Sequence, residues 1–173
     1  MISTKKFFLF ASFVLLILIS VRVNADSLYA GLELGKAEFS GGDFKGGSVS
    51  NLFGGYRFGS LYLQLDFFAF EDFSHSNFRD SYLQLDAYAV QAGVQFDLGK
   101  VNLQGGVGLF SWEEDAVLFS RGFGSDSGTS ELIDVGLLGS TSEHTTLQLG
   151  FKHIGDVSGA DLQIISLGLR YNF

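Results

Sequence analysis

The sequence predicts an all-β protein, an eight-stranded antiparallel up-and-down transmembrane β-barrel. Three observations favour this fold. Apolar and polar residues alternate with a period of two in eight segments, as in strands that place alternate side chains on opposite faces of a sheet. Long polar stretches and very short turns alternate between these segments. The chain also ends on such a segment, 162–173, and a large apolar final residue indicates that this end lies in a medium other than water.

Residues 1–25 have the pattern of a secretory signal peptide, which we expect to be cleaved between Ala25 and Asp26. Lys5 and Lys6 precede an apolar run that ends at Val21, and small residues occupy the cleavage site. An uncleaved helical anchor is the weaker alternative, because a spanning helix needs about 20 apolar residues. Residues 26–173 are then expected to form one domain, the membrane β-barrel.

The composition excludes some classes of protein. Loss of Lys5, Lys6 and Arg22 with the signal peptide would change the net charge from −8 to −11, so we expect no nucleic acid as a partner. The chain has no cysteine, so an exported domain of this size must be stabilised by something other than disulfides. Insertion into a membrane would supply that stability.

The eight predicted strands each have local evidence. They cover 28–39, 51–58, 61–70, 82–96, 101–112, 131–139, 145–154 and 162–173. The first has Leu or Ala at even positions from 28 to 34, and the second is joined to the third by the turn Gly59-Ser60. In the fourth, the apolar positions change from Leu83 and Leu85 to Val90 and later even residues. We therefore expect a β-bulge at 87–89.

The last four strands follow the short turn 97–100. Apolar residues occupy odd positions such as Val101 and Leu103 in the fifth strand, and Leu147 and Leu149 in the seventh. The sixth is the least regular, because apolar residues there fall on both parities. Four long connections, 40–50, 71–81, 113–130 and 155–161, are expected at the opposite end from the short turns, facing outside the cell.

The alternation alone leaves open which face points inward. The polar parity holds charges of both signs interspersed with glycine, which fits a narrow interior with enclosed ion pairs. We therefore place five side chains inside the barrel: Glu33, Arg57, Asp66, Lys152 and Arg170. Aromatic residues near segment ends are typical of interfacial girdles. These are Tyr29, Phe58, Trp112, Tyr171 and Phe173.

With these features, the chain resembles the OmpA-like outer-membrane β-barrel family of Gram-negative bacteria. The resemblance rests on the signal peptide and on the stretches NLFGGYRF (51–58), FKHIGD (151–156) and ISLGLRYNF (165–173). It implies location in the cell outer membrane, contact with its lipid and lipopolysaccharide, and recognition of the terminal pattern with Tyr171 and Phe173 by the outer-membrane assembly machinery. Because the chain ends with the last strand, we expect no peptidoglycan-binding domain.

An enzymatic role has one candidate pair. Some small outer-membrane barrels are lipid A deacylases that use a His and a nearby Ser, but no Ser lies two positions after His153, and Ser158 is the nearest in that stretch. A divalent cation at 113–115 is the weaker reading of a solvated acidic loop. We therefore expect no enzyme activity and no catalytic, cofactor-binding or metal-binding residue.

The expected function is a structural scaffold whose surface loops serve envelope integrity, adhesion or recognition, with an extracellular ligand at the loops. We expect a monomer. A narrow channel is one alternative, although about eight strands enclose room for side chains only. A lipid A-modifying enzyme is another. A soluble lipocalin-like carrier is disfavoured because Trp112, the one Trp, lies mid-chain instead of near the N-terminus.

Overall fold

The computed structural model describes residues 28–40, 46–74, 81–118 and 121–173. The strands are β1 (Leu28–Ser40), β2 (Gly47–Phe58), β3 (Leu61–Phe70), β4 (Phe73–Ser74), β5 (Tyr82–Asp97), β6 (Val101–Leu118), β7 (Arg121–Ser140), β8 (Thr145–Val157) and β9 (Ala160–Asn172). The proposed signal peptide, with Ala25 and Asp26, lies outside these ranges. No helix in the described part of the chain is long and apolar enough to cross a membrane.

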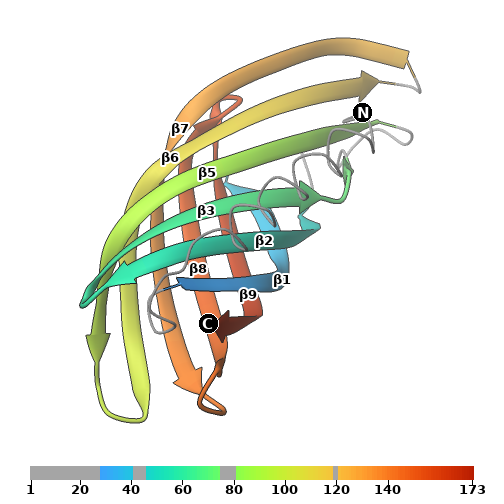
Figure 1. Cartoon of the computed structure of the whole chain (residues 1–173). Helices are drawn as coiled ribbons and strands as arrows, with labels where there is room; N and C mark the ends of the chain where they lie inside the picture. Colours follow the sequence, from blue (N-terminus) through green and yellow to red (C-terminus); the bar gives the residue numbers. More distant parts are fainter. Residues whose placement is uncertain (1–27, 41–45, 75–80, 119–120) are drawn as a thin grey trace.

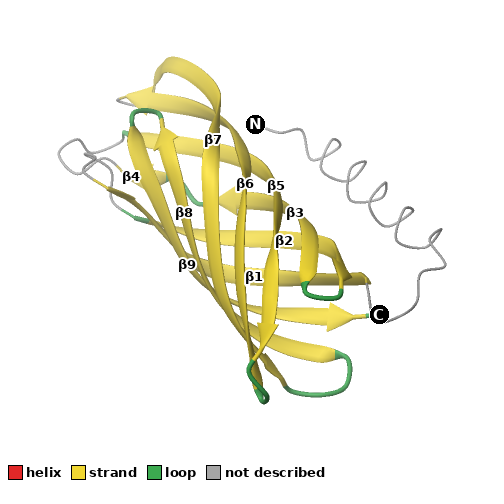
Figure 2. Ribbon diagram, turned by 90° about the vertical axis from the view of Figure 1, so that its left-hand side faces the viewer, coloured by secondary structure: helices red, strands yellow, loops and turns green. Residues whose placement is uncertain are grey.

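Eight long strands form a closed antiparallel barrel (Figures 1 and 2). Successive long strands pair along the chain, so that β3 pairs directly with β5, and the first strand pairs with the last. The two-residue strand β4 pairs with the start of β5. The predicted eight-stranded up-and-down barrel is therefore confirmed.

Apolar side chains form a continuous band on the outside of the barrel. In β9, for example, Ile165, Leu167 and Leu169 are about half exposed or more, while Ile164 and Arg170 are buried inside. The outward run from Ile165 to Phe173 has the length of about 9–11 residues that a tilted transmembrane strand needs. Corresponding residues on neighbouring strands lie opposite in register, so that the band surrounds the barrel.

The segment 113–130, predicted to be the longest loop, is mostly strand. Pairing between β6 and β7 runs from Val101 opposite Gly139 to Leu118 opposite Arg121, with one irregularity at Ala116. Figure 1 shows these two strands arching together at the top of the view. The sequence does not predict this hairpin, because its glycine, serine and charged residues form no apolar face with a period of two.

The expected bulge at 87–89 is also absent. β5 pairs without a register shift with both β3 and β6 across these residues. Odd residues of β5 point inward throughout, so Leu83 and Leu85 are buried, as is Gln91, whereas Val90 is exposed outside. The apolar parity changes because the interior itself changes from apolar to polar along the strand.

Candidate functional site

The middle of the barrel interior holds a buried charge network centred on Lys152. Its ammonium group donates to Glu33 Oε2 at 2.7 Å and lies 3.5 Å from Asp134 Oδ1. All three side chains are almost completely excluded from solvent. A buried charge must be compensated by a partner, and here one cation is shared by two carboxylates from β1 and β7.

Glu33 has room to reach Lys152 because the residue opposite it on the neighbouring strand β9 is a glycine. Gly168 lies opposite Glu33 in the β1–β9 register, and a Cβ there would come within 2.6 Å of Glu33 Cγ. The second oxygen of Glu33 accepts a hydrogen bond of 2.8 Å from the Gln148 amide. The alternation of glycine with polar residues therefore provides both the groups and the space for the network.

Asp66 is held by amide groups instead of by a direct cation contact. Asn51 and Gln64 donate to its Oδ1 at 2.7 and 3.0 Å, and Gln91 donates to its Oδ2 at 2.8 Å. Asn51 also donates to Glu33 at 3.0 Å, which connects the two carboxylates. Such charge-assisted hydrogen bonds are about twice as strong as neutral ones.

Towards the end of the barrel with the short turns, Arg170 lies across the interior. Its guanidinium is stacked 3.9 Å above the Tyr29 ring, and it donates to Gln104 at 3.0 Å and, more weakly, to Gln95 at 3.5 Å. Its Nε has no hydrogen-bond partner within the described part of the chain. Stacking on an aromatic ring is a stable position for guanidinium.

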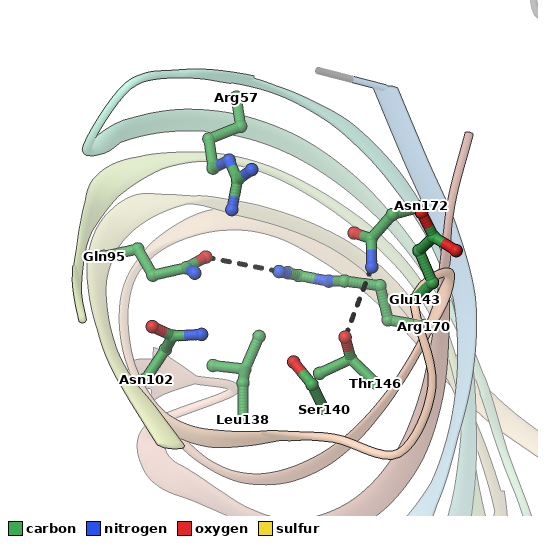
Figure 3. Close-up of a pocket in the computed structure, with 9 residues that line it drawn as sticks. All are labelled: Arg57, Gln95, Asn102, Leu138, Ser140, Glu143, Thr146, Arg170 and Asn172. Carbon is green, nitrogen blue, oxygen red and sulfur yellow. Dashed lines mark hydrogen bonds between the residues drawn. The ribbon is translucent and has the colours of Figure 1, made fainter. Parts of the chain in front are cut away.

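A cavity of about 170 Å³ lies beside Arg170 (Figure 3). Arg57 from β2 and Arg170 from β9 both point into it. The rest of its lining is mostly polar and consists of Gln95, Asn102, Leu138, Ser140, Glu143, Thr146 and Asn172. A wider hollow next to it shares Arg57 and is lined by the exposed turn Gly59-Ser60. We call this cavity the turn-side pocket.

The opposite half of the interior is an apolar core. Phe68, Phe110 and Leu132 are buried there, with Trp112 and Ile164. Phe73 of β4 is completely buried and lies with its ring centroid 5.0 Å from that of Phe39. The barrel is therefore filled by a polar network in the middle and by packed apolar side chains towards the long connections.

The five side chains that the sequence placed inside lie as follows. Glu33, Asp66, Lys152 and Arg170 are buried in the interior, and Arg57 is partly exposed in the turn-side pocket. Sequence reasoning missed Asp134 and the amides that bind the carboxylates, which are Asn51, Gln64, Gln91, Gln104 and Gln148. The amides could have been found from the sequence, because they lie on the polar parity of their strands. Asp134 could not, because apolar residues surround it on both parities of β7.

The aromatic prediction was partly wrong. Phe58, Tyr171 and Phe173 are exposed on the outer face, but Tyr29 and Trp112 point inward and are buried. Trp112 donates its indole N–H to Ser130 at 2.9 Å. A buried Trp or Tyr is stabilised by such a polar partner, and the Tyr29 hydroxyl likewise donates to Gln64 at 3.0 Å.

The candidate catalytic residues do not form a nucleophile–base pair. The Ser158 hydroxyl donates to Glu114 at 2.6 Å, inside the barrel mouth, whereas the His153 ring lies 3.9 Å from Asp161 on the outer face. Glu114 is buried while Glu113 and Asp115 are exposed on the other side of β6, so these three carboxylates do not converge. Within the described ranges, no group of three His, Asp or Glu could hold a metal ion.

A closed barrel with an apolar outer band and an interior filled by a charge network and packed side chains defines a transmembrane β-barrel protein. Residues 11–173 match the family model described as outer membrane protein beta-barrel domain. The chain belongs to this family and is an outer-membrane protein.

Solved structures of outer-membrane proteins share the fold. Neisserial surface protein A (NspA) aligns with a TM-score of 0.68 at 17% identity, over 84% of this chain and 97% of that one. The N-terminal barrel of Pseudomonas aeruginosa OprF aligns with a TM-score of 0.64 at 14% identity, over 84% of this chain and 97% of that one. Ail, the attachment invasion locus protein of Yersinia pestis, aligns with a TM-score of 0.59 at 19% identity, over 85% of this chain and 97% of that one. The comparison with curated proteins gave no match.

Proposed function

We propose that the protein is a non-enzymatic, non-conducting scaffold that presents its β6–β7 hairpin outside the cell for recognition of a partner. The observation that carries this proposal is the pairing of the two strands beyond the apolar band, from Phe110 opposite Ser130 to Leu118 opposite Arg121, with one register shift after Ala116. A paired hairpin holds its surface groups in fixed positions, whereas a free loop of the same length loses conformational entropy on binding.

The outer face of this extension is acidic. Glu113 and Asp115 are exposed on β6, Glu131 is exposed on β7, and Asp86 of β5 lies opposite Glu113. Partial burial, reinforced by the carboxylates of Glu113 and Asp115, raises the pKa of Asp86 above its ordinary value. The negative potential favours a basic partner.

A relative with this fold offers a contrast. Ail has been crystallised in complex with the heparin analogue sucrose octasulfate, which is a polyanion. The acidic β6–β7 face would repel such a ligand, so recognition here should have the opposite charge preference. PagL, an outer membrane enzyme, has a similar fold at 11% identity and a TM-score of 0.51. The separation of Ser158 from His153 supports a non-enzymatic role for this chain.

The experiment measures binding of an oligolysine peptide and of heparin to the barrel in nanodiscs. The matched variant carries Glu113→Gln, Asp115→Asn and Glu131→Gln, which keep shape and remove charge. We expect the peptide to bind the unmodified protein and to lose at least tenfold in affinity to the variant, with no binding of heparin. Equal binding of the peptide by both proteins would refute the proposal. A shift in lipid A mass on expression would instead support the enzyme alternative.

Assembly is a second part of the proposed biology. Tyr171 and Phe173 are exposed at the outer face of β9, and the Phe173 N–H donates to the Leu28 carbonyl at 3.0 Å. We expect Phe173→Ala to lower the yield of outer-membrane protein in cells, since the resemblance marks this terminus as an assembly signal. Refolding in detergent should be retained, because one exposed side chain contributes at most about 2 kcal/mol of apolar burial. Unchanged yield in cells would contradict this role.

A further inference from the structure

We propose that the turn-side pocket binds a phosphate group, either as free phosphate or as the headgroup of an anionic phospholipid. Two guanidinium groups, from Arg57 and Arg170, point into one cavity of about 170 Å³. Guanidinium groups bind phosphate through paired N–H donors, and amide and hydroxyl donors in the same lining can bind the remaining oxygens.

The charge of Arg170 lacks a direct counter-ion. Its side chain is 3% exposed, yet none of the carboxylates in the described ranges lies within 4 Å of it. The three buried carboxylates lie deeper and have other partners, since Lys152 contacts Glu33 and Asp134, and amides surround Asp66. The interior is therefore polarised along its axis, with negative charge in the middle and positive charge at the turn end.

The Arg170 guanidinium also retains donor capacity. Stacking on Tyr29 uses one face of the group, and among the described residues Gln104 accepts the one short hydrogen bond that it donates. The contact to Gln95 is long at 3.5 Å, and Nε has no partner. An unsatisfied N–H on a buried charged group is costly, so an anion beside it would be stabilised.

The surroundings of the pocket supply neutral donors on several strands. Asn102 of β6 lines the cavity, and the Asn172 amide donates to Thr146 at 3.2 Å within it. Glu143, the one carboxylate in the lining, is exposed at the rim, where water screens its charge. The neighbouring hollow, which is lined by the turn Gly59-Ser60, gives an entry path from solvent.

The position of the pocket decides which phosphates can reach it. Short turns of outer-membrane barrels face the periplasm. A pocket at this end meets periplasmic solutes and the headgroups of the inner leaflet, and both can supply phosphate. This end is remote from the acidic β6–β7 extension, so the site is independent of the function proposed above.

The test observes arginine Nε–H signals by ¹⁵N NMR in the full barrel. Residues 26–173 contain only four arginines, at positions 57, 79, 121 and 170, which makes the signals assignable. One arm titrates inorganic phosphate into protein in a maltoside detergent at constant ionic strength, with chloride as the reference anion. The other compares nanodiscs of phosphatidylglycerol with nanodiscs of phosphatidylcholine alone.

We expect a saturable shift of the Arg170 signal with phosphate, with phosphatidylglycerol, or with both, and none with chloride. Arg57→Gln should weaken binding about tenfold or more, because it removes a charged donor while Arg170 remains as the reporter. Glu143→Gln should strengthen binding, and Arg121→Gln at the far end of β7 should leave it unchanged. Free phosphate is the source if only the first arm responds, and lipid if only the second does.

The proposal is overturned if neither arm shifts the Arg170 signal, or if chloride shifts it equally. It is also overturned if Arg57→Gln, folded as judged by its amide spectrum, binds phosphate as well as the unmodified protein does. Arg170→Gln serves as a second variant in which saturable shifts of the Arg57 signal should disappear.

Discussion

Lys152 shows at the scale of single residues how the interior is stabilised. Its charge is buried and shared between Glu33 and Asp134. Lys152→Met fills a similar volume but leaves two carboxylates uncompensated, and we expect the free energy of unfolding to fall by about 3–5 kcal/mol. Urea unfolding in lipid vesicles measures this.

Lys36→Met is the matched control for this change. Lys36 points outward and is exposed, so its loss should alter the free energy of unfolding by about 0.5 kcal/mol or less. Adding Glu33→Gln to Lys152→Met should recover part of the lost stability, because the double variant buries one charge fewer. Equal effects of Lys152→Met and Lys36→Met would show that the buried pair contributes nothing.

Adjacent residues of β8 separate the membrane reading from the soluble one. Leu149 is half exposed on the outer face, while Gln148 is buried and bonded to Glu33. A probe on Leu149→Cys should be quenched by lipid-soluble quenchers, and Gln148→Cys should react slowly with a charged maleimide. The absence of native cysteine keeps the labelling specific. Rapid aqueous labelling of Gln148→Cys without lipid quenching of Leu149→Cys would reverse the two faces.

Periodicity predicted the inward direction of residues such as Glu33 and Lys152, because a strand alternates strictly between two faces. It could not predict partners. The contact between Lys152 and Glu33 joins residues from β8 and β1, and it depends on the stagger between strands and on the space left by Gly168. Tyr29 lies inside and not in a girdle, because the parity of its position in β1 sets its direction and its aromatic character does not.

At the scale of elements, the part of the β6–β7 hairpin next to the barrel contributes to its stability, whereas the tip around 116–124 does not. Glu114 accepts from Ser158, and Ser130 accepts from Trp112 and donates to the Asp156 carbonyl, so the part of the hairpin next to the barrel is bonded to the β8–β9 connection. Replacing 116–124 by Asn-Gly should keep the free energy of unfolding within about 1 kcal/mol, since loop closure depends weakly on length.

Replacing 113–130 by the same turn should instead lower the free energy of unfolding by about 2–4 kcal/mol, through lost hydrogen bonds and exposure of Trp112. Denaturant titration of both variants in one lipid composition makes the comparison. Equal stability of the two variants would mean that 113–130 behaves as a free loop, as the sequence alone predicts.

The ends of the strands were the hardest part of the fold to predict, because pairing with a neighbouring strand decides where a strand ends. The start of β7 contains glycine, serine and aspartate, which are depleted in strands, and it is strand because β6 pairs with it. The apparent change of phase in β5 had a different origin. It reflects the interior changing from polar around Gln91 to apolar around Leu85, which only the assembled barrel defines.

At the scale of the whole molecule, the filled interior predicts the absence of ion conduction. The network around Lys152 and the packed core around Phe73 occupy successive levels of the barrel. In planar bilayers we expect no stepwise single-channel currents. Phe73→Ala combined with Phe110→Ala, which opens the apolar level alone, should remain silent because the charged level persists. Regular conductance steps from the unmodified protein would support the channel alternative.

The pairing of β1 with β9 brings the start and the end of the described barrel together, from Tyr29 opposite Asn172 to Ser40 opposite Asp161. These are the strands most distant in sequence, so this seam can form only after the last strand has been synthesised. Until then both edges carry unpaired peptide groups, which hydrocarbon does not tolerate. We therefore expect entry into the bilayer and sealing of this seam to be concerted, and we expect a chain truncated before Ala160, with two open edges, to stay out of lipid.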